Sequence, residues 1–288
     1  MIVVSSSFPV GKLAVNRIPV FILSGGRYAS AIVLMAPLLV IFRKSFFQVK
    51  RRHFLLLILQ AFFGVWIFNI FLFWGLKYIP STNSGIILGT VPTMVVILSR
   101  IFYREPLTLR KVVGLVLAFT AVWLINQPGN TAAGTTGSNY WLGILFVMIA
   151  AIGEALFLFI SKTTSTYVNP YVSASLITIF GFFMIIPLSI WEAQSVVLSQ
   201  FDYRDVLLMV YFGLVVTFLG YVLWFRGVSA VPAGISAYFT SVMPISAVFL
   251  SGLILGETIR LIHYIALILI VSAILTCIYQ PGNRESKK

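Results

Sequence analysis

The sequence predicts an all-α membrane protein with ten transmembrane helices in two inverted five-helix repeats. Composition is the first reason: of 288 residues, 60% are hydrophobic and only 9% are charged, whereas a soluble domain is usually about a quarter charged. The second reason is that the stretch from Gly75 to Leu109 occurs twice in the chain. The third is that most basic residues lie between alternate apolar runs, as expected of cytoplasmic loops.

The two copies of this stretch align without a gap at a spacing of 152 residues. Further upstream, Lys12 and Pro37 recur as Lys162 and Pro187 at a spacing of 150. Such a register is improbable by chance in so apolar a chain, so we interpret the chain as two copies of one unit. The matched residues are Gly75, Pro80, Ser84, Pro92, Glu105 and Leu109, then Gly227, Pro232, Ser236, Pro244, Glu257 and Leu261. The predicted domains are a first repeat at 1–130, an external linker at 131–140, a second repeat at 141–283 and a cytoplasmic tail at 284–288.

A helix that spans the membrane needs roughly 20 apolar residues, and several stretches satisfy this in order along the chain. They cover residues 20–42, 54–76, 81–103, 112–127, 141–161, 171–191, 205–226, 232–254 and 262–280, the fourth being short. The segment from Met1 to Asn16 is a further candidate, although the 11 residues before Lys12 reach only about 16 Å as a helix. It has neither the basic start nor the cleavage site of a secretory signal. Because the repeat matches it to 141–161, we expect a first helix that is shortened or starts late.

An odd number of helices per copy turns the second copy upside down relative to the first, which gives an inverted repeat. With both termini in the cytoplasm, fourteen basic residues fall on inner segments and six on outer segments or helix ends. This imbalance favours that orientation in a plasma or inner cell membrane. The six outer residues are Lys12, Arg17, Arg27, Lys77, Arg204 and Arg260.

The net charge of +13 would suggest a nucleic-acid partner in a soluble protein. Here the basic residues lie between apolar runs, as in cytoplasmic loops, so we expect no such partner. The basic cluster from Arg43 to Arg52 is interpreted as a topology determinant, with acidic lipid as the alternative ligand. Cys277 is the single cysteine, so no disulfide framework is expected. His53 and His263 lie far apart and each beside a helix end, which predicts interfacial histidines and no metal site. No Walker loop, paired carboxylates or nucleophile constellation is present, so we expect neither an enzyme nor a cofactor.

The doubled block resembles the signature of the drug/metabolite transporter superfamily, and more narrowly of its ten-helix EamA-type branch. In the first copy it runs from Tyr78-Ile79-Pro80 to Pro92 and Glu105-Pro106-Leu107, with Arg104 where a glycine is common. The second copy runs from Val231-Pro232 to Pro244 and Leu255-Gly256-Glu257, which is closer to the usual pattern. The resemblance implies inverted halves around a central cavity and alternating access. It identifies no substrate, because the family transports amino acids, sugars, nucleotide derivatives, drugs and lipid-linked intermediates.

Glu154 is the acidic residue that lies well inside an apolar run, eight residues before Lys162. The same spacing of glutamate and lysine occurs in the first helix of the small multidrug resistance proteins, which the second copy also resembles. The matching position in the first copy is Val4, so the acid exists in one half alone. A carboxylate inside the membrane is expensive and predicts proton coupling or substrate contact. The alternative is a protonated glutamate that hydrogen-bonds a neighbouring helix.

Polar or amphipathic side chains within the predicted helices are further candidates for a binding pocket. They are Asn69, Trp66, Tyr221 at the repeat position of Asn69, and Tyr238, with Asn83, Thr90 and Thr240 beside them. Asn69 is favoured because a buried amide without a partner costs several kcal/mol. Most of the aromatic residues are expected to serve the core or the membrane interface.

Other recurring residues are interpreted as architecture. Glu105 and Glu257 each lie where a helix ends, so we expect them to cap the N–H groups of the next helix. Pro92 and Pro244 fall in the middle of predicted helices, where proline bends the chain. The Gly85-x-x-x-Gly89 and Gly252-x-x-x-Gly256 patterns predict close helix packing.

These observations predict a secondary active transporter that exports a small organic metabolite, such as an amino acid or drug-like compound, in exchange for protons. A passive facilitator is one alternative, and a non-transporting membrane subunit or lipid-carrier partner is another. We expect a small-molecule substrate and membrane lipid as partners. Because an inverted repeat lets one chain form a complete pathway, we expect a monomer.

Overall fold

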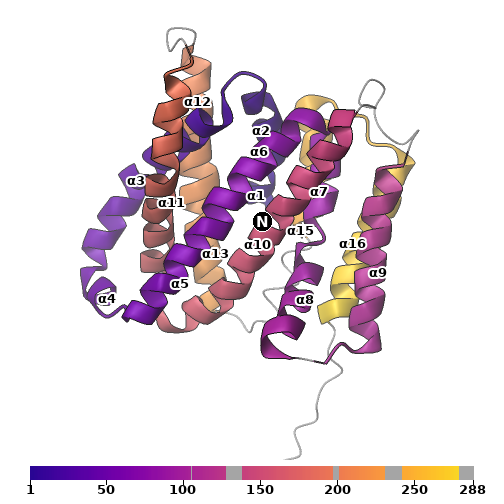
Figure 1. The fold of residues 1–288 in the computed structure, drawn as a ribbon, viewed down its shortest axis with the longest axis horizontal. Helices are drawn as coiled ribbons and strands as arrows, with labels where there is room; N and C mark the ends of the chain where they lie inside the picture. The colour runs from indigo at the N-terminus through magenta and orange to yellow at the C-terminus, as the bar shows by residue number, and fades with distance from the viewer. Residues whose placement is uncertain (105, 128–137, 197–200, 231–241, 279–288) are drawn as a thin grey trace, which may run out of the picture.

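The computed structural model describes residues 1–104, 106–127, 138–196, 201–230 and 242–278, and this part of the chain is helical, with no strand (Figure 1). The first part of the chain contains α1 (Ile2–Ser5), α2 (Ser7–Val15), α3 (Val20–Ile41), α4 (Arg43–Phe47), α5 (Arg51–Ala61), η1 (Phe62–Ile67), α6 (Phe68–Tyr78), α7 (Ser81–Leu88), α8 (Val91–Tyr103) and α9 (Leu109–Ile125). The second part contains α10 (Ser138–Tyr167), α11 (Pro170–Ala193), α12 (Tyr203–Tyr211), η3 (Phe212–Leu219), α13 (Gly220–Ala230), α15 (Val242–Leu255) and α16 (Leu261–Ile278).

Within the described ranges, six helical segments are long and apolar enough to cross a membrane. They are Val20–Ile41, Arg51–Tyr78, Ser81–Tyr103, Asn139–Tyr167, Pro170–Ala193 and Tyr203–Ala230. Shorter apolar helices cover Ile2–Val15, Val242–Leu255 and Leu261–Cys277. The chain is therefore a multi-pass membrane protein, and the count of ten helices remains a prediction.

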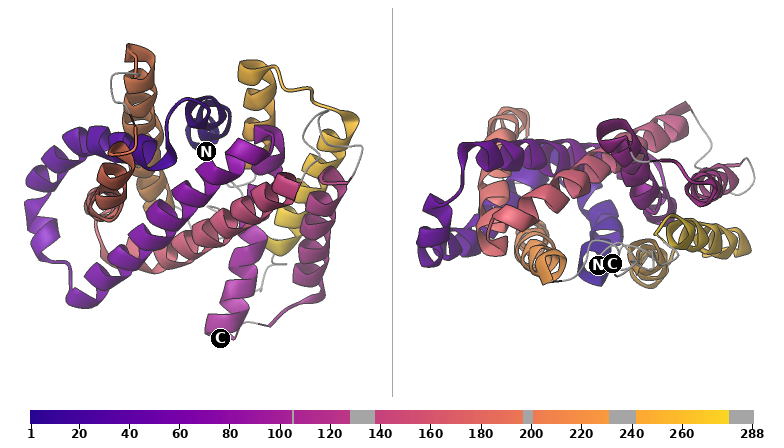
Figure 2. Two further views of the ribbon diagram at one scale, coloured as in Figure 1. Left: turned by 45° about the horizontal axis from the view of Figure 1, so that its top comes forward. Right: turned by 90° about the horizontal axis from the view of Figure 1, so that it is seen from below.

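The helices pack in pairs that join the two parts of the chain. The closest pairs are α9 with α16, α3 with α11, α6 with α10, and α7 with α15. The α9–α16 pair stands at one edge of the molecule in each view of Figures 1 and 2. Two of these pairs, α9 with α16 and α3 with α11, join helices at matching positions of the sequence repeat.

Two long spans, Arg51–Tyr78 and Tyr203–Ala230, each contain a π-helical turn. The turn η1 separates α5 from α6, and η3 separates α12 from α13. They begin at Phe62 and Phe212. These positions are 150 residues apart, the same spacing that separates Lys12 from Lys162. A π turn shifts the side chains that follow it around the helix axis and is frequent at functional sites.

Several connections meet at one end of the helices. Arg17, after α2, donates to Asp205 Oδ1 at 2.8 Å and to Asp202 Oδ2 at 3.0 Å, at the start of α12. Lys12 Nζ donates to the carbonyl oxygens of Leu76 and Ile79, the latter at 2.9 Å. This lysine therefore caps the carboxyl end of α6, where free carbonyl groups favour a cation.

Pro92 lies near the middle of the span Ser81–Tyr103, as predicted, and the helix is interrupted just before it. The helix stops at Leu88 and α8 starts at Val91, so Pro92 lies in the first turn of a new segment, where its missing N–H group costs no hydrogen bond. Pro244 is the third residue of α15, which begins at Val242, and residues 231–241 lie outside the described part of the chain. Pro37 lies in the interior of α3 and Pro187 in the interior of α11.

Candidate functional site

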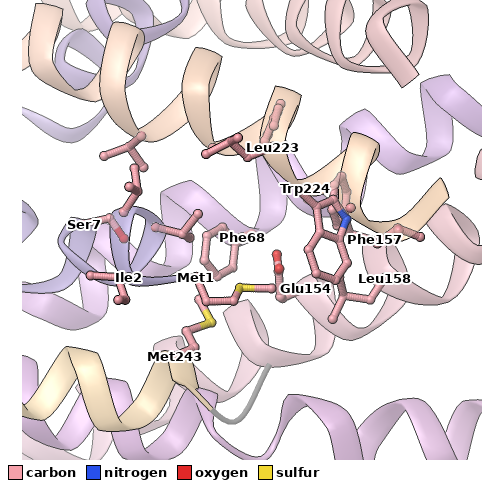
Figure 3. A pocket seen from close by; sticks show the side chains of 18 of the residues that line it. Met1, Ile2, Ser7, Phe68, Glu154, Phe157, Leu158, Leu223, Trp224 and Met243 are labelled. Atoms are coloured by element: carbon pink, nitrogen blue, oxygen red, sulfur yellow. The ribbon is translucent and has the colours of Figure 1, made fainter. Parts of the chain in front are cut away.

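A cavity of about 690 Å³ lies between helices from both parts of the chain. Its wall is formed by residues of α1, α2, α3, η1, α6, α10, η3, α13 and α15. Most of this wall is apolar, and Figure 3 shows Phe68, Phe157 and Leu158 around it. The ionisable side chains in the wall are Arg27, Glu154 and Tyr221.

The predicted acid, Glu154, projects from α10 into this cavity (Figure 3). No hydrogen bond joins its carboxylate to any residue that the structure describes. The alternative of a glutamate bonded to a neighbouring helix therefore finds no partner within the described ranges. The carboxylate is left facing the cavity, where a proton or a bound molecule can reach it.

Arg27 is a second charged group of the cavity, and its predicted position at an outer segment or helix end is wrong. It lies inside α3 and is only 4% exposed. Its Nε donates to Thr217 Oγ1 at 2.6 Å, and its Nη1 donates to Asn69 Oδ1. The ring centroids of Tyr28 and Phe212 lie 5.3 and 5.4 Å from the guanidinium carbon, within the range of cation–π attraction.

The groups that hold Arg27 lie in one π turn, η3, and just after the other, η1. Thr217 lies within η3, and its hydroxyl also donates to Phe212 O at 2.9 Å. Asn69 follows η1 and donates from Nδ2 to the hydroxyl of Tyr28 and to Val65 O, both at 2.8 Å. Thr217 occupies the repeat position of Val65, so this arrangement of donors and acceptors exists in one copy of the unit alone.

The predicted site residues occupy different places in the structure. Tyr221 lines the cavity, with its hydroxyl beside that of Tyr28. Asn69 is fully buried behind Arg27 and holds its guanidinium rather than lining the cavity. Trp66 stacks on Phe62, 5.5 Å between ring centroids, away from the cavity wall. Tyr238 and Thr240 lie outside the described residues.

Trp224 was not predicted, although it carries a polar group beside the cavity. Its ring lines the cavity (Figure 3). Its indole nitrogen Nε1 is buried and has no hydrogen-bond partner in the part of the chain that the structure describes. A buried donor without an acceptor is unfavourable, so this position offers a hydrogen bond that the described protein does not use.

The helix-end glutamates and His263 differ in part from expectation. Glu257 does cap a helix, but that helix is α7 rather than the following α16. Glu105 lies outside the described residues.

His263 is not interfacial: it is 5% exposed, and its Nε2 lies 3.3 Å from Asn83 Oδ1. Among the residues searched, no group of three or more His, Cys, Asp or Glu side chains could hold a metal ion.

Comparison with known proteins gives a consistent set of relatives. The model of the EamA-like transporter family matches residues 1–127 and 141–279. The uncharacterized transporter YetK of Bacillus subtilis (strain 168) is 37% identical over 287 residues, covering 99% of this chain and 86% of that protein. An uncharacterized transporter of Archaeoglobus fulgidus is 26% identical over 255 residues, covering 88% of this chain and 87% of that protein. A solved crystal structure matches with a TM-score of 0.67 at 15% identity, covering 96% of this chain and 92% of the other, which supports the fold alone.

Proposed function

Because the chain belongs to the EamA-like transporter family, we propose that it is a secondary active transporter that exports a small organic metabolite in exchange for protons. Its family and its apolar helices make it a membrane transporter. In the proposal, ten helices form two inverted repeats in the cytoplasmic membrane, with both termini in the cytoplasm. The family also argues against an enzyme, and the cavity serves transport rather than catalysis.

The observation that carries the proposal is the carboxylate of Glu154, which faces the cavity without a hydrogen-bond partner among the described residues. Ionisable groups within membrane spans commonly belong to substrate or proton pathways. A single carboxylate that both the substrate and a proton can occupy makes the two compete. If the cavity opens to each side of the membrane in turn, this competition exchanges one for the other.

The first experiment is a thermal-shift screen of the purified protein in detergent against a broad set of metabolites. Compounds that stabilise the protein are then loaded into proteoliposomes, and their efflux is followed under an inward proton gradient. We expect the gradient to accelerate efflux through the wild type. The Glu154→Gln variant should lose this acceleration, because an amide neither binds nor releases a proton at the pH values of the efflux assay.

The matched control is Glu192→Gln. Glu192 accepts hydrogen bonds from the N–H groups of Phe21 and Ile22 at 2.8 and 2.9 Å and does not line the cavity. This variant should keep the response to the gradient. Efflux from the wild type that ignores the gradient would indicate a facilitator. Acceleration that persists in Glu154→Gln would remove this residue from the coupling step.

A further inference from the structure

We propose that Arg27 binds the carboxylate of the transported molecule, so that the substrates are small zwitterions with an apolar body. This inference rests on the proposed transport function and names the substrate class of the same cavity. In it, the carboxylate contacts Arg27 and the ammonium group faces Glu154. The apolar body lies against the aromatic and aliphatic wall.

The first argument is that neutral groups hold the guanidinium of Arg27 in place and that it makes no direct ion pair with a described residue. The groups that contact its Nε and Nη1 are a threonine hydroxyl and an asparagine amide, both of which are neutral. Its third nitrogen, Nη2, has no hydrogen-bond partner within the described ranges. No carboxylate of a described residue lies within 4.0 Å of the guanidinium. A buried charge without a counter-charge is strongly unfavourable.

The second argument comes from the shape of the donor. A guanidinium presents N–H groups in a planar fork that matches a carboxylate, and such charge-assisted pairs are stronger than neutral hydrogen bonds. Thr217 and Asn69 fix the orientation of this fork, and Arg27 lines the cavity. The fixed fork therefore favours a carboxylate over a neutral polar group.

The third argument is charge balance. Glu154 projects from α10 and Arg27 from α3, and no ion pair joins them at 4.0 Å or less. A zwitterion placed between them pairs each of these two side-chain charges with its opposite. A simple anion would pair Arg27 but make no ion pair with Glu154, so it would not compete with the proton for that carboxylate. A simple cation would pair Glu154 and leave Arg27 without a direct counter-charge in a water-poor site.

The cavity also fits the rest of such a molecule. Its volume of about 690 Å³ lies in the range of sites that bind small molecules. Phe68, Phe157, Leu158 and Met243 supply apolar surface around Glu154 (Figure 3). An apolar side chain is therefore favoured over a sugar or another highly hydroxylated body.

The test uses matched probes on the purified full-length protein in detergent. One set is leucine, 3-methylbutylamine, which lacks the carboxylate, and 4-methylpentanoate, which lacks the amine. A second set is phenylalanine, 2-phenylethylamine and 3-phenylpropionate. Dissociation constants come from thermal shift at increasing probe concentration. We expect at least one of the two zwitterions to bind about tenfold or more tightly than both of its truncated analogues, as one charge-assisted contact is lost in each.

Variants then assign the contacts. Arg27→Gln should weaken the zwitterion about tenfold and leave the amine probe within about twofold of its wild-type value. Glu154→Gln should show the opposite pattern, with the preference for a carboxylate retained. Because Arg27→Gln removes a buried charge and can unfold the protein, Arg27→Lys is measured beside it. The lysine keeps the charge without the fork, so its affinity for the zwitterion should lie between those of Arg27→Gln and the wild type.

The proposal is overturned if the amine probes bind as tightly as the zwitterions, or if Arg27→Gln weakens both kinds equally, as a purely structural role would. Binding of none of the six probes overturns it as well. The transport function is tested separately, because it is measured as proton-driven efflux and not as probe binding. A cationic or neutral metabolite whose efflux follows the proton gradient and ignores Arg27→Lys would refute this inference and leave the transport function standing.

Discussion

The carboxylate of Glu257, which follows α15, caps the amino terminus of α7 at Ser81. One carboxylate oxygen accepts hydrogen bonds from the N–H and the hydroxyl of Ser81, both at 2.9 Å. The other accepts from the N–H of Thr82, also at 2.9 Å. The first N–H groups of a helix have no partner within it and carry partial positive charge. The cap therefore links the two parts of the chain at one end of the α7–α15 pair.

We expect Glu257→Gln to destabilise the protein by about 1–2 kcal/mol, because the amide nitrogen would face a backbone N–H group that the carboxylate now satisfies. The measurement is denaturant or thermal unfolding of the purified protein in detergent. Ser81→Ala removes one of the three donors and completes a double-mutant cycle. Strictly additive losses in the double variant would contradict a direct interaction between the two side chains.

The close approach of α3 to η3 predicts a second effect, at Gly213. A Cβ atom there would lie 2.5 Å from Arg27 O and 2.9 Å from Ala31 N, both backbone atoms that cannot rotate away. Gly213→Ala should therefore separate the two helices and destabilise the protein by about 1–3 kcal/mol.

Gly227→Ala is the matched control for Gly213→Ala. Gly227 lies in α13, and a Cβ atom there would meet no heavy atom within 4 Å. Alanine is favoured over glycine inside a helix by about 1 kcal/mol, so this variant should melt at or above the wild-type temperature. Equal melting temperatures for the two variants would show that the α3–η3 contact is looser than described.

The capping box at the start of α12 predicts a dependence of stability on pH. Desolvation raises the pKa of Asp202, but the backbone N–H groups of Asp205 and Arg204 and the adjacent Arg17 lower it by more, so the pKa lies below its usual value. A lowered pKa in the folded state means that the ionised carboxylate stabilises the protein above the ordinary aspartate pKa of about 3.9. This stabilisation is lost as the pH falls through the lowered value.

Asp202→Asn isolates this contribution, because asparagine is also a good helix cap but does not ionise. The wild type should melt above the variant at pH 6, and the difference should shrink as the pH falls from about 5 towards 3. A difference that stays constant over this interval would show that the charge of Asp202 contributes nothing. Both proteins are measured in the same detergent, so that the titration of other acidic groups cancels.

The sequence predicted the positions of most spans because hydrophobic length alone marks them. The stretch 20–42 corresponds to Val20–Ile41, and 171–191 corresponds to Pro170–Ala193. Partners between helices could not be predicted in the same way. A carboxylate at a helix end indicates a cap, but only the packing of α15 against α7 determines that Glu257 reaches Ser81.

The candidate site shows the same division. Glu154 and Tyr221 were singled out as ionisable or polar groups within apolar runs, and both line the cavity. Arg27 also lies inside the apolar stretch 20–42, but the imbalance of basic residues between the two sides of the membrane favours an outer helix end for it. The π turns that bring Thr217 and Asn69 to it have no sequence signature comparable to a hydrophobic period, so the site around Arg27 required the structure.

The repeat predicts a stabilising substitution at Arg104. Arg104 ends α8 with φ 55° and ψ 26°, and Gly256, at the matching position after α15, has φ 65°. Both copies therefore leave their helix through a left-handed residue, which costs a side chain roughly 1–2 kcal/mol. Glycine avoids this cost but loses about 0.5–1 kcal/mol through the greater freedom of the unfolded chain.

Arg104→Gly should accordingly stabilise the protein by about 0.5–1 kcal/mol, and Gly256→Ala should destabilise it by a similar amount. Arg104→Ala is the control, because it removes the same exposed side chain and keeps the backbone strain. Thermal melting in detergent should rank Arg104→Gly above both the wild type and Arg104→Ala. If the alanine variant melts as high as the glycine variant, the gain comes from the lost positive charge, and the two copies do not share this turn for the same physical reason.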